Sequence, residues 1–425
     1  MHIRKSADFL HRTIHSYTLP IIKERTVKLI FILLYILSFG LLNGQNNECN
    51  CSKNIDFMME EIQNSSPSYN IIDNKQTFIK RADSIKNIAQ NDSNKYNCLK
   101  YVNMVLRPIQ DGHLKVYPKR NVDFKDHKSV NEFLNSIKFN NSKIEALDFA
   151  TADSTATYYS YNDKITILIK EYEPNNYYGI VIESKSKFWR KGEVVLDFQK
   201  KANYFEGVRY SITKDPYFYR TQTVERLLKN FRVSKFPKEH LGIFNRTEEK
   251  LSIKILDNKI LYVSIKSFKN NTKEENDEFQ NFFSNIVLPN YKLYDKIIFD
   301  VRDNSGGAMA YTLFFKDLKK IKTEKTIYVL QNRQTASAGE LFIIDLKKMT
   351  PITSFGENTA GMTAFRDLKA VHLPCYNYFL WKPIKKLNRK FRDYLKYEHN
   401  GIGADFELKE NENWLEKVVN EFNNG

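Results

Sequence analysis

Apolar residues recur at helical spacing between about Asn54 and Met104, as in "IDFMMEEI" and "YNCLKYVNMVL". Residues three and four apart share one face of a helix, so this pattern predicts amphipathic helices that pack together. Pro108 follows, and we expect the helical stretch to end there because proline cannot continue a helix. The pattern predicts an N-terminal helical domain, which we place at residues 46–140.

The pattern changes between about Ala146 and Lys238. Short alternating or β-branched runs appear there, "KITILIKEY", "YYGIVIE", "GEVVLDF" and "GVRYSI", and Asn, Gly and charged residues separate them. Such runs are typical of strands joined by turns. We therefore predict a β-rich middle domain at residues 141–245, built as a sandwich or a small barrel.

After His240 strands and helices alternate. Strand-like runs read "KILYVSI", "YDKIIFDV" and "KTIYVL", and helical runs read "EENDEFQNFFSNI", "YTLFFKDLKKI" and "SAGELFIIDLKKM". Strands with successive apolar residues are covered on both faces, which favours a largely parallel sheet between helices. The sequence predicts an α/β domain at residues 246–425.

The N-terminus has the pattern of an export signal. Basic residues precede an apolar run from Leu29 to Leu42, and polar residues follow it. Such a run gives roughly 21 Å of helix, short of the roughly 30 Å hydrocarbon core of a membrane. We predict a signal peptide at residues 1–45, a periplasmic or secreted product, and membrane contact only through this segment. Because the basic region is unusually long, an uncleaved anchor or a start site further downstream is the alternative.

Composition changes this picture little. Of the 425 residues 42% are hydrophobic and 27% are charged, as in globular proteins. The net charge is +16, but its 66 Lys and Arg are scattered and form no nucleic-acid motif, so we expect a solvated basic surface. Export permits a disulfide, for example from the Cys49/Cys51 pair to Cys98, while the pairing of these cysteines and Cys375 stays open. No ligand spacing predicts a metal site.

Ser337 lies where the strand-like "TIYVLQNR" gives way to the helical "SAGELFIIDL". A helix that begins here would direct unpaired backbone N–H groups, including that of Ala338, into the space beside the hydroxyl. This arrangement suits a nucleophile, because the oxyanion formed on attack needs fixed donors. The alternative is a helix cap, in which Glu340 completes a capping box with Ser337.

A second candidate feature is the end of the strand "KIIFDV", which runs into "RDNSGG". Gly306 and Gly307 let another segment or a substrate carbonyl approach the backbone closely, and the N–H group of either could be a second oxyanion donor. A plain tight turn is the alternative interpretation.

Three segments in this order, "IIFDVRDNSGG", "VLQNRQTASAGE" and "ITSFGENTAG", resemble the core of the carboxyl-terminal processing peptidases over about residues 250–410. The resemblance implies a serine hydrolase with a crotonase/ClpP-like catalytic domain. It also implies that Ser337 is the nucleophile and that Ala338 and Gly306 or Gly307 form the oxyanion hole. In the processing branch of the family the base is a lysine, at the position that corresponds to the residue after Gly361. Here that residue is Met362, which cannot accept a proton.

The tricorn-like branch of the family instead uses a histidine and a glutamate. The segment "QDGHLKV" resembles its histidine motif, which implies His113 as the base, although Gly112 stands where tricorn has a second serine. A late Glu-x-x-Gly-x-x-Pro-Asp segment implies Glu398 as the glutamate, with Ala404 in place of the proline. Histidine suits the role because its pKa lies near working pH. Glu398 would fix its tautomer or support the assembly.

The sequence therefore predicts an exported serine-type peptidase that acts on peptides or unfolded proteins through an acyl-enzyme, without a metal or organic cofactor. The mechanism requires His113 to lie within about 3 Å of Ser337. Two alternatives are an inactive, peptidase-like peptide-binding protein and a non-peptidase hydrolase on the same scaffold. Cleavage specificity and oligomeric state are not predicted.

Overall fold

The computed structural model describes residues 49–136, 157–160, 164–221, 249–256, 259–270, 272–309, 311–321 and 324–424, with short stretches between 223 and 241. Residues Asn50–Gly425 form one compact unit. The predicted signal peptide lies outside the described residues. Within them, no helix is long and apolar enough to cross a membrane. Export of the protein therefore stays a prediction.

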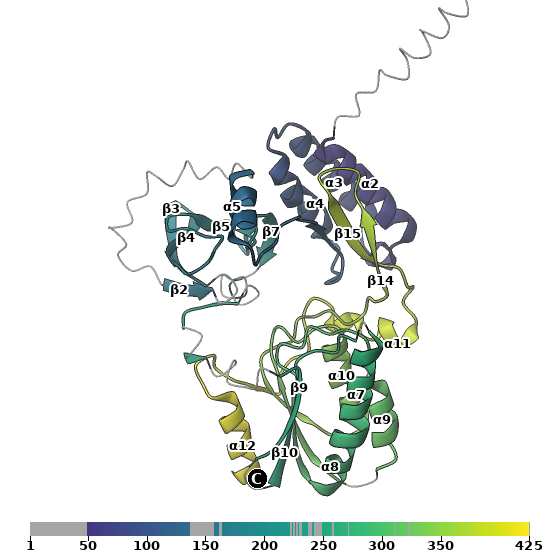
Figure 1. The fold of residues 1–425 in the computed structure, drawn as a ribbon. Helices are drawn as coiled ribbons and strands as arrows, with labels where there is room; N and C mark the ends of the chain where they lie inside the picture. Colours follow the sequence, from purple (N-terminus) through teal and green to yellow (C-terminus); the bar gives the residue numbers. More distant parts are fainter. Residues whose placement is uncertain are drawn as a thin grey trace, which may run out of the picture. The chain divides into compact units, whose positions relative to one another are not determined.

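The N-terminal region is helical, as predicted (Figure 1). Asn50 and Asn74 cap the first two helices, because their side chains accept hydrogen bonds from N–H groups of the first turn. The apolar faces of the helices meet in one core, which includes Met58, Phe78 and Leu99. The elements are α2 (Cys51–Ser65), η1 (Pro67–Ile71), α3 (Lys75–Gln90), η2 (Lys95–Asn97) and α4 (Cys98–Leu106).

A three-stranded antiparallel sheet joins this region to the C-terminal half of the chain. Strand β1 (Lys115–Pro118) pairs with β15 (Tyr378–Pro383), which in turn pairs with β14 (Leu368–His372). Leu373 and Leu380 of this hairpin lie in the same core as the helices. The pairing, which the sequence did not predict, fixes the short turn between α4 and β1.

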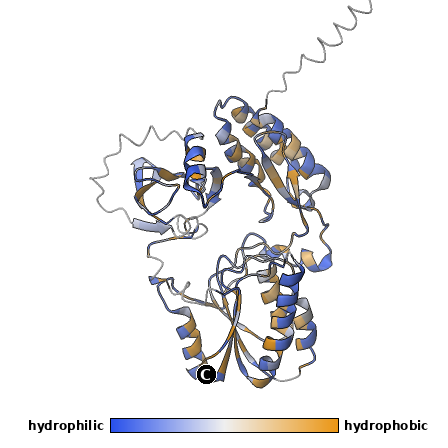
Figure 2. Ribbon diagram, in the orientation of Figure 1, coloured by the Kyte–Doolittle hydropathy of each residue, from blue (hydrophilic) through white to orange (hydrophobic). Residues whose placement is uncertain are grey.

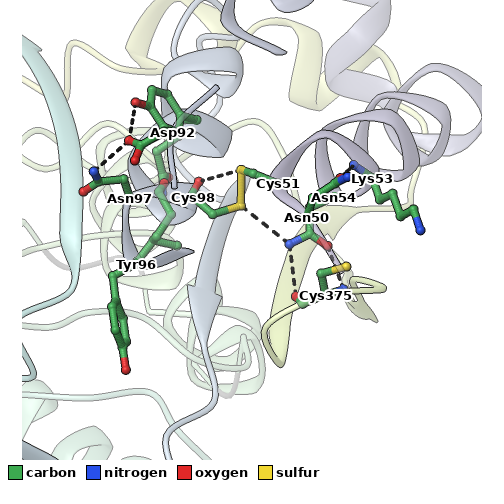
Figure 3. Close-up of a disulfide and its surroundings, with 12 residues drawn as sticks. Asn50, Cys51, Lys53, Asn54, Asp92, Tyr96, Asn97, Cys98 and Cys375 are labelled. Atoms are coloured by element: carbon green, nitrogen blue, oxygen red, sulfur yellow. Dashed lines mark hydrogen bonds between the residues drawn. A yellow bond between two sulfur atoms is a disulfide. The ribbon is translucent and has the colours of Figure 1, made fainter. Parts of the chain in front are cut away.

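A disulfide links the helices to each other beside that hairpin (Figure 3). Cys51 at the start of α2 is bonded to Cys98 at the start of α4, as one of the expected pairings has it. Asn54 bonds twice to the backbone of Cys375: its Nδ2 donates to the carbonyl at 3.0 Å, and its Oδ1 accepts from the N–H at 2.8 Å. No cysteine of the described residues is free. These bonds hold α2, α4 and the hairpin together.

The middle region forms a seven-stranded antiparallel sheet in the order β7-β6-β5-β4-β3-β2-β8. Its buried side includes Trp189 and Phe198. The described strands belong to one sheet, so they do not form the two packed sheets of a sandwich. The elements are α5 (His127–Ser136), β2 (Thr157–Ser160), β3 (Ile165–Glu173), β4 (Asn176–Ser184), β5 (Val194–Lys200), β6 (Phe205–Tyr210), β7 (Pro216–Thr221) and β8 (Val233–Ser234).

The C-terminal region is a six-stranded sheet between helices, in the order β16-β13-β12-β11-β10-β9. All neighbours are parallel except the β9–β10 pair at one edge, which confirms the predicted largely parallel sheet. The strands are β9 (Leu251–Leu256), β10 (Ile260–Ile265), β11 (Lys296–Asp300), β12 (Thr326–Gln331), β13 (Thr353–Gly356) and β16 (Phe406–Glu407).

Helices cover both faces of this sheet, so its central strands are buried. Trp414 and Phe422 of α12 pack on one face, and Phe283, Phe314 and Phe342 belong to the core on the other. Figure 2 shows hydrophobic and hydrophilic positions side by side on α7 and α12. The elements are α7 (Lys273–Asn281), the π-helix η7 (Phe282–Val287), α8 (Leu288–Leu293), α9 (Thr312–Leu318), α10 (Ala338–Lys347), α11 (Arg389–Arg392), the 3₁₀ helix η8 (Leu395–Tyr397) and α12 (Trp414–Asn424).

The loops after β11 and β12 are bonded to each other where these parallel strands end. The Ala336 N–H donates to the Asn304 carbonyl at 2.8 Å, and the Thr335 hydroxyl donates to the Val301 carbonyl at 2.8 Å. The Asn332 side chain accepts from the Asp303 N–H at 2.9 Å. The candidate nucleophile and the glycine pair therefore lie on adjoining loops.

The disulfide gives the first prediction. Replacing both Cys51 and Cys98 with serine opens a loop of sequence separation 47, and we expect the free energy of unfolding to fall by about 2–4 kcal/mol. Urea unfolding of the oxidised protein and of the variant measures this difference. To check that the disulfide is formed, the unreduced wild type is unfolded and treated with maleimide, which should not label Cys51. Equal unfolding curves for the two proteins would contradict the prediction.

Candidate active site

Ser337 is the N-cap residue of α10 and lies at a sharp turn after β12. Its backbone has φ 53° and ψ −118°, in the positive-φ region that residues with a Cβ rarely adopt. Backbone strain of this kind persists only where surrounding contacts enforce it, and it is concentrated at functional sites. The turn brings the Ser337 hydroxyl to 3.2 Å from Nε2 of His113.

Glu340 holds this turn from inside the protein. Ser337 and Glu340 have the arrangement of a capping box, and Glu340 Oε2 accepts from the Ser337 N–H at 3.0 Å. The carboxyl group also accepts from the Thr359 hydroxyl at 2.5 Å and from the N–H groups of Gly361 and Met362. Burial raises the pKa of Glu340 to about 7, although these hydrogen bonds lower it. Ser337 is therefore the N-cap residue of α10, and its hydroxyl faces the histidine and makes no capping hydrogen bond.

His113 comes from the turn between α4 and β1 and is buried. Its Nε2 faces the serine hydroxyl, while its Nδ1 has no hydrogen-bond partner among the described residues. Burial, with a smaller contribution from the charge of Lys115, lowers the pKa of His113 to about 4. The ring is therefore neutral at neutral pH and can accept a proton.

Asp111, which the sequence motifs did not single out, has the carboxyl group nearest to that ring nitrogen. Its Oδ1 lies 4.0 Å from His113 Nδ1 and accepts from the backbone N–H of His113 at 2.8 Å. Its Oδ2 accepts from the Ser68 hydroxyl at 2.5 Å. Burial, together with the nearby charge of Glu398, raises the pKa of Asp111 to about 7, although the hydrogen bond from Ser68 lowers it. The available signal was its place in "QDGHLKV", two residues before the histidine.

Glu398 is buried beside the histidine motif, but its hydrogen bonds go to the backbone. Its Oε1 accepts from the Gly112 N–H at 3.0 Å, and its Oε2 accepts from Thr363 and Ala364 at 2.8 and 2.7 Å. Burial raises its pKa against these bonds. Glu398 was expected either to fix the tautomer of His113 or to support the assembly. The hydrogen bonds that it accepts from Gly112, Thr363 and Ala364 come from backbone N–H groups and not from the imidazole.

Two of the predicted oxyanion donors, Gly306 and Ala338, lie next to Ser337, and Gly307 follows Gly306 in the same loop. A Cβ on Gly306 would meet the Ser337 Cβ at 2.7 Å and the Ala338 nitrogen at 2.9 Å. The Gly306 N–H itself donates to Asn304 Oδ1 at 2.9 Å. No acceptor among the described residues is found for the N–H groups of Gly307 and Ala338. Of the two glycines, Gly307 therefore has the N–H group that a substrate could use.

Gly112 and Met362 contact each other directly. A Cβ on Gly112 would lie 2.5 Å from Met362 Cγ and 3.2 Å from the Gly361 carbonyl oxygen. The two departures from the family pattern, no second serine and no lysine, thus meet at one place. A serine at position 112 does not fit beside this methionine without a shift.

Asp111, His113 and Glu398 are also the one group of described residues whose spacing could suit a metal ion, with ligand atoms within 4.8 Å of one another. However, both oxygens of Asp111 and both oxygens of Glu398 already accept hydrogen bonds. A cation there would compete with these N–H and O–H donors for the carboxylate oxygens. The donor set fits a hydrogen-bonded support of the histidine better than a metal centre.

Comparison with known families bears on the same segment. Residues 312–374 match the model of Peptidase family S41. The match confirms the resemblance inferred from the motifs and contains Ser337, but it includes neither His113 nor Glu398. No protein of curated function matches the sequence. The match over residues 312–374 therefore indicates a hydrolase of the serine peptidase class.

Several solved structures are similar to this chain at low identity. A putative peptidase from Parabacteroides merdae is 14% identical, with 88% of this chain and 96% of that chain covered and a TM-score of 0.42. A putative S41 protease from Bacteroides fragilis is 11% identical, with 87% and 97% covered and a TM-score of 0.40. The photosystem II D1 C-terminal processing protease is 12% identical, with 85% and 93% covered and a TM-score of 0.34.

The contact of Gly112 with Met362 predicts a coupled pair of substitutions. We expect Gly112→Ser to lower the free energy of unfolding by about 1–3 kcal/mol, because the new side chain overpacks against the methionine. Adding Met362→Ala opens space, so the double variant should lose less than the sum of the two single variants. Urea unfolding of all four proteins measures the coupling, and additive losses would refute it.

Proposed function

We propose that this protein is a serine-type peptidase that hydrolyses peptide bonds through an acyl-enzyme. The observation that carries the proposal is the 3.2 Å separation between Ser337 Oγ and His113 Nε2, two groups 224 residues apart in sequence. Such a pair is the hallmark of an activated nucleophile. The match to Peptidase family S41 over residues 312–374 supports the same class.

In the proposed reaction the Ser337 hydroxyl attacks the scissile carbonyl carbon while His113 Nε2 takes its proton. The carbonyl oxygen becomes an oxyanion, which the N–H groups of Ala338 and Gly307 stabilise. When the tetrahedral intermediate collapses, the C–N bond breaks and the amine leaves with the proton from His113. Water then attacks the acyl-enzyme by the same steps and releases the acid product.

We assign the supporting roles according to the contacts. Asp111 is a positioning residue, since it is the carboxylate that His113 Nδ1–H faces, and a 4.0 Å separation can shorten when substrate binds. Glu398 braces the backbone of the histidine motif. The residues described need no metal or organic cofactor for this chemistry.

Further expectations from the sequence complete the proposal. We propose a crotonase/ClpP-like catalytic domain at residues 246–425, after a helical domain at 46–140 and a β-rich domain at 141–245. The parallel sheet and its flanking helices support the first of these. Export through the segment 1–45 and action on peptides or unfolded proteins follow from the sequence patterns alone.

A fluorophosphonate probe tests the nucleophile without knowledge of the substrate. The purified protein should form a covalent adduct at Ser337, and Ser337→Ala should form none. His113→Gln should react at least about a thousandfold more slowly, because the hydroxyl loses its base.

Ser84, which is exposed on α3, provides a matched control, because Ser84→Ala should be labelled like the wild type. Failure of the folded wild-type protein to react would favour the inactive, peptide-binding alternative. Reaction at another serine would remove Ser337 as the nucleophile.

The labelling rate should depend on pH in two steps. His113 is a base only when neutral, and since burial lowers its pKa to about 4, the first rise should fall below the ordinary histidine value of 6.5. Asp111 ionises near 7, and its charge then stabilises the imidazolium that forms, so we expect a second rise of about tenfold. Asp111→Asn should remove the second rise and keep the first.

Glu340 is the other nearby carboxyl group whose pKa burial raises to about 7. A second rise that persists in Asp111→Asn would therefore belong to Glu340 and would contradict the role given to Asp111. Ser68→Ala is the matched control, because it removes a hydrogen bond to Asp111 but leaves the carboxyl group in place. That variant should keep both steps.

A further inference from the structure

A large cavity adjoins the Ser337–His113 pair. It has a volume of about 1190 Å³, and its wall includes Gly112 and Met362. Gly112 directly precedes His113, and the Met362 N–H donates to the same carboxyl group as the Ser337 N–H. Neither Ser337 nor His113 itself lines the cavity, so the cavity begins beside the pair, at Gly112 and Met362.

The wall of the cavity is strongly cationic. Five of its residues carry a positive charge, and none carries a negative charge. They come from segments far apart in the sequence: Arg107, Lys115, Arg220, Arg226 and Arg333. His399 also lines the cavity, but burial and the neighbouring charges of Arg107 and Arg226 lower its pKa to about 4, so it is neutral at neutral pH.

These cations are poorly neutralised by the protein itself. Arg220 pairs with Glu206 at 2.7 Å, and the other four form no ion pair within the described part of the chain. Arg107 donates to the Arg220 carbonyl at 2.7 Å, and Arg226 donates to the His399 carbonyl at 3.2 Å. Nε of Arg333 is buried and has no hydrogen-bond partner among the described residues.

The repulsion between these neighbouring cations costs free energy in the protein without a ligand. Burial, together with the charges of Arg220 and Arg226, lowers the pKa of Arg107. Burial also lowers the pKa of Arg333; the charge of Glu357 raises it, that of Arg226 lowers it, and those of Glu410 and Glu407 raise it. A ligand that brings carboxylates into the cavity relieves this repulsion and gains charge-assisted hydrogen bonds.

We infer that the cavity binds an acidic segment of the peptide substrate, one with several Asp or Glu side chains. The inference rests on the proposed peptidase function and names the substrate class of its site. A single terminal carboxylate would engage one or two guanidinium groups, whereas five cations around one cavity match several carboxylates. Since the wall is continuous with the residues beside Ser337, the acidic segment lies next to the bond to be cleaved.

Binding to the Ser337→Ala variant tests the inference without catalysis. The probes are fluorescein-labelled Glu–Ala repeat and Gln–Ala repeat peptides of equal length, each with a free or an amidated C-terminus. We expect the Glu peptide to bind at least about tenfold more tightly than the Gln peptide, with or without amidation, and to weaken as salt is added. Equal affinity for the two, or binding that amidation abolishes, would overturn the inference.

Variants of the protein give a second test. Lys115→Gln and Arg333→Gln, each in the Ser337→Ala background, should weaken binding of the Glu peptide by about three- to tenfold and leave the Gln peptide unchanged. Lys369→Gln is the matched control, because Lys369 is exposed on β14 and outside the cavity wall. An equal loss in that variant would show a general charge effect and overturn the inference.

Two further measurements separate this inference from the proposed function. An oligodeoxythymidine that binds more tightly than the Glu peptide would assign the cavity to nucleic acid and overturn the inference. Selective Glu-peptide binding supports the inference even if the probe does not label Ser337, in which case only the peptidase proposal fails. If the wild type cleaved the Glu and Gln peptides at equal kcat/KM, the proposed peptidase function would stand and the inference of an acidic substrate would be overturned.

Discussion

The contact between His113 and Ser337 is the constraint on which the proposed chemistry depends, and it is made between segments 224 residues apart. A serine hydroxyl alone is a weak nucleophile, and a shift of about 1 Å in its base has a large effect on rate. The chain meets this demand with backbone pairing, since β1 begins just after His113 and bonds to β15 in register. Glu398 adds a bond to the Gly112 N–H, so the histidine turn is fixed on both sides.

Three buried carboxyl groups organise the loops around this contact. Glu340 connects Ser337 to Gly361 and Met362, Glu398 connects Gly112 to Thr363 and Ala364, and Asp111 connects His113 to Ser68. A buried carboxylate is costly unless donors surround it, and here most of the donors are backbone N–H groups. The same bonds that satisfy these carboxyl groups therefore hold five separate segments in one arrangement, those of Ser68, Asp111–His113, Ser337–Glu340, Gly361–Ala364 and Glu398. The strained backbone of Ser337 persists because Glu340 and the N-terminus of α10 enforce it.

The sequence predicted the parts of the fold that depend on local patterns. Hydrophobic spacing identified the helices before Pro108 and the parallel strands after His240, because both patterns reflect burial along one element. Motif order selected Ser337 and His113 as candidates, and their side chains lie 3.2 Å apart. Hydrophobic spacing and motif order could not show that β1 pairs with β15 of the β14–β15 hairpin. The two segments are far apart in the sequence, and their alternation of polar and apolar residues does not distinguish them from other strands. For the same reason the sequence left open which of Gly306 and Gly307 has a free N–H group. It selected Glu398 and not Asp111, although Asp111 has the carboxyl group 4.0 Å from the imidazole nitrogen.

The two departures from the family pattern, glycine in place of the second serine and methionine in place of the lysine, are adjacent in space, because Gly112 contacts Met362. Loss of the second serine leaves a residue without a Cβ, and the methionine that stands in place of a lysine occupies the adjoining space. The same two residues form part of the wall of the cationic cavity, where a lysine would add yet another positive charge beside His113. Lys115 already lowers the pKa of His113 through its charge, and a second lysine would lower it further and weaken the base. A neutral thioether at position 362 thus suits the proposed use of histidine as the base, next to a cavity lined by cations.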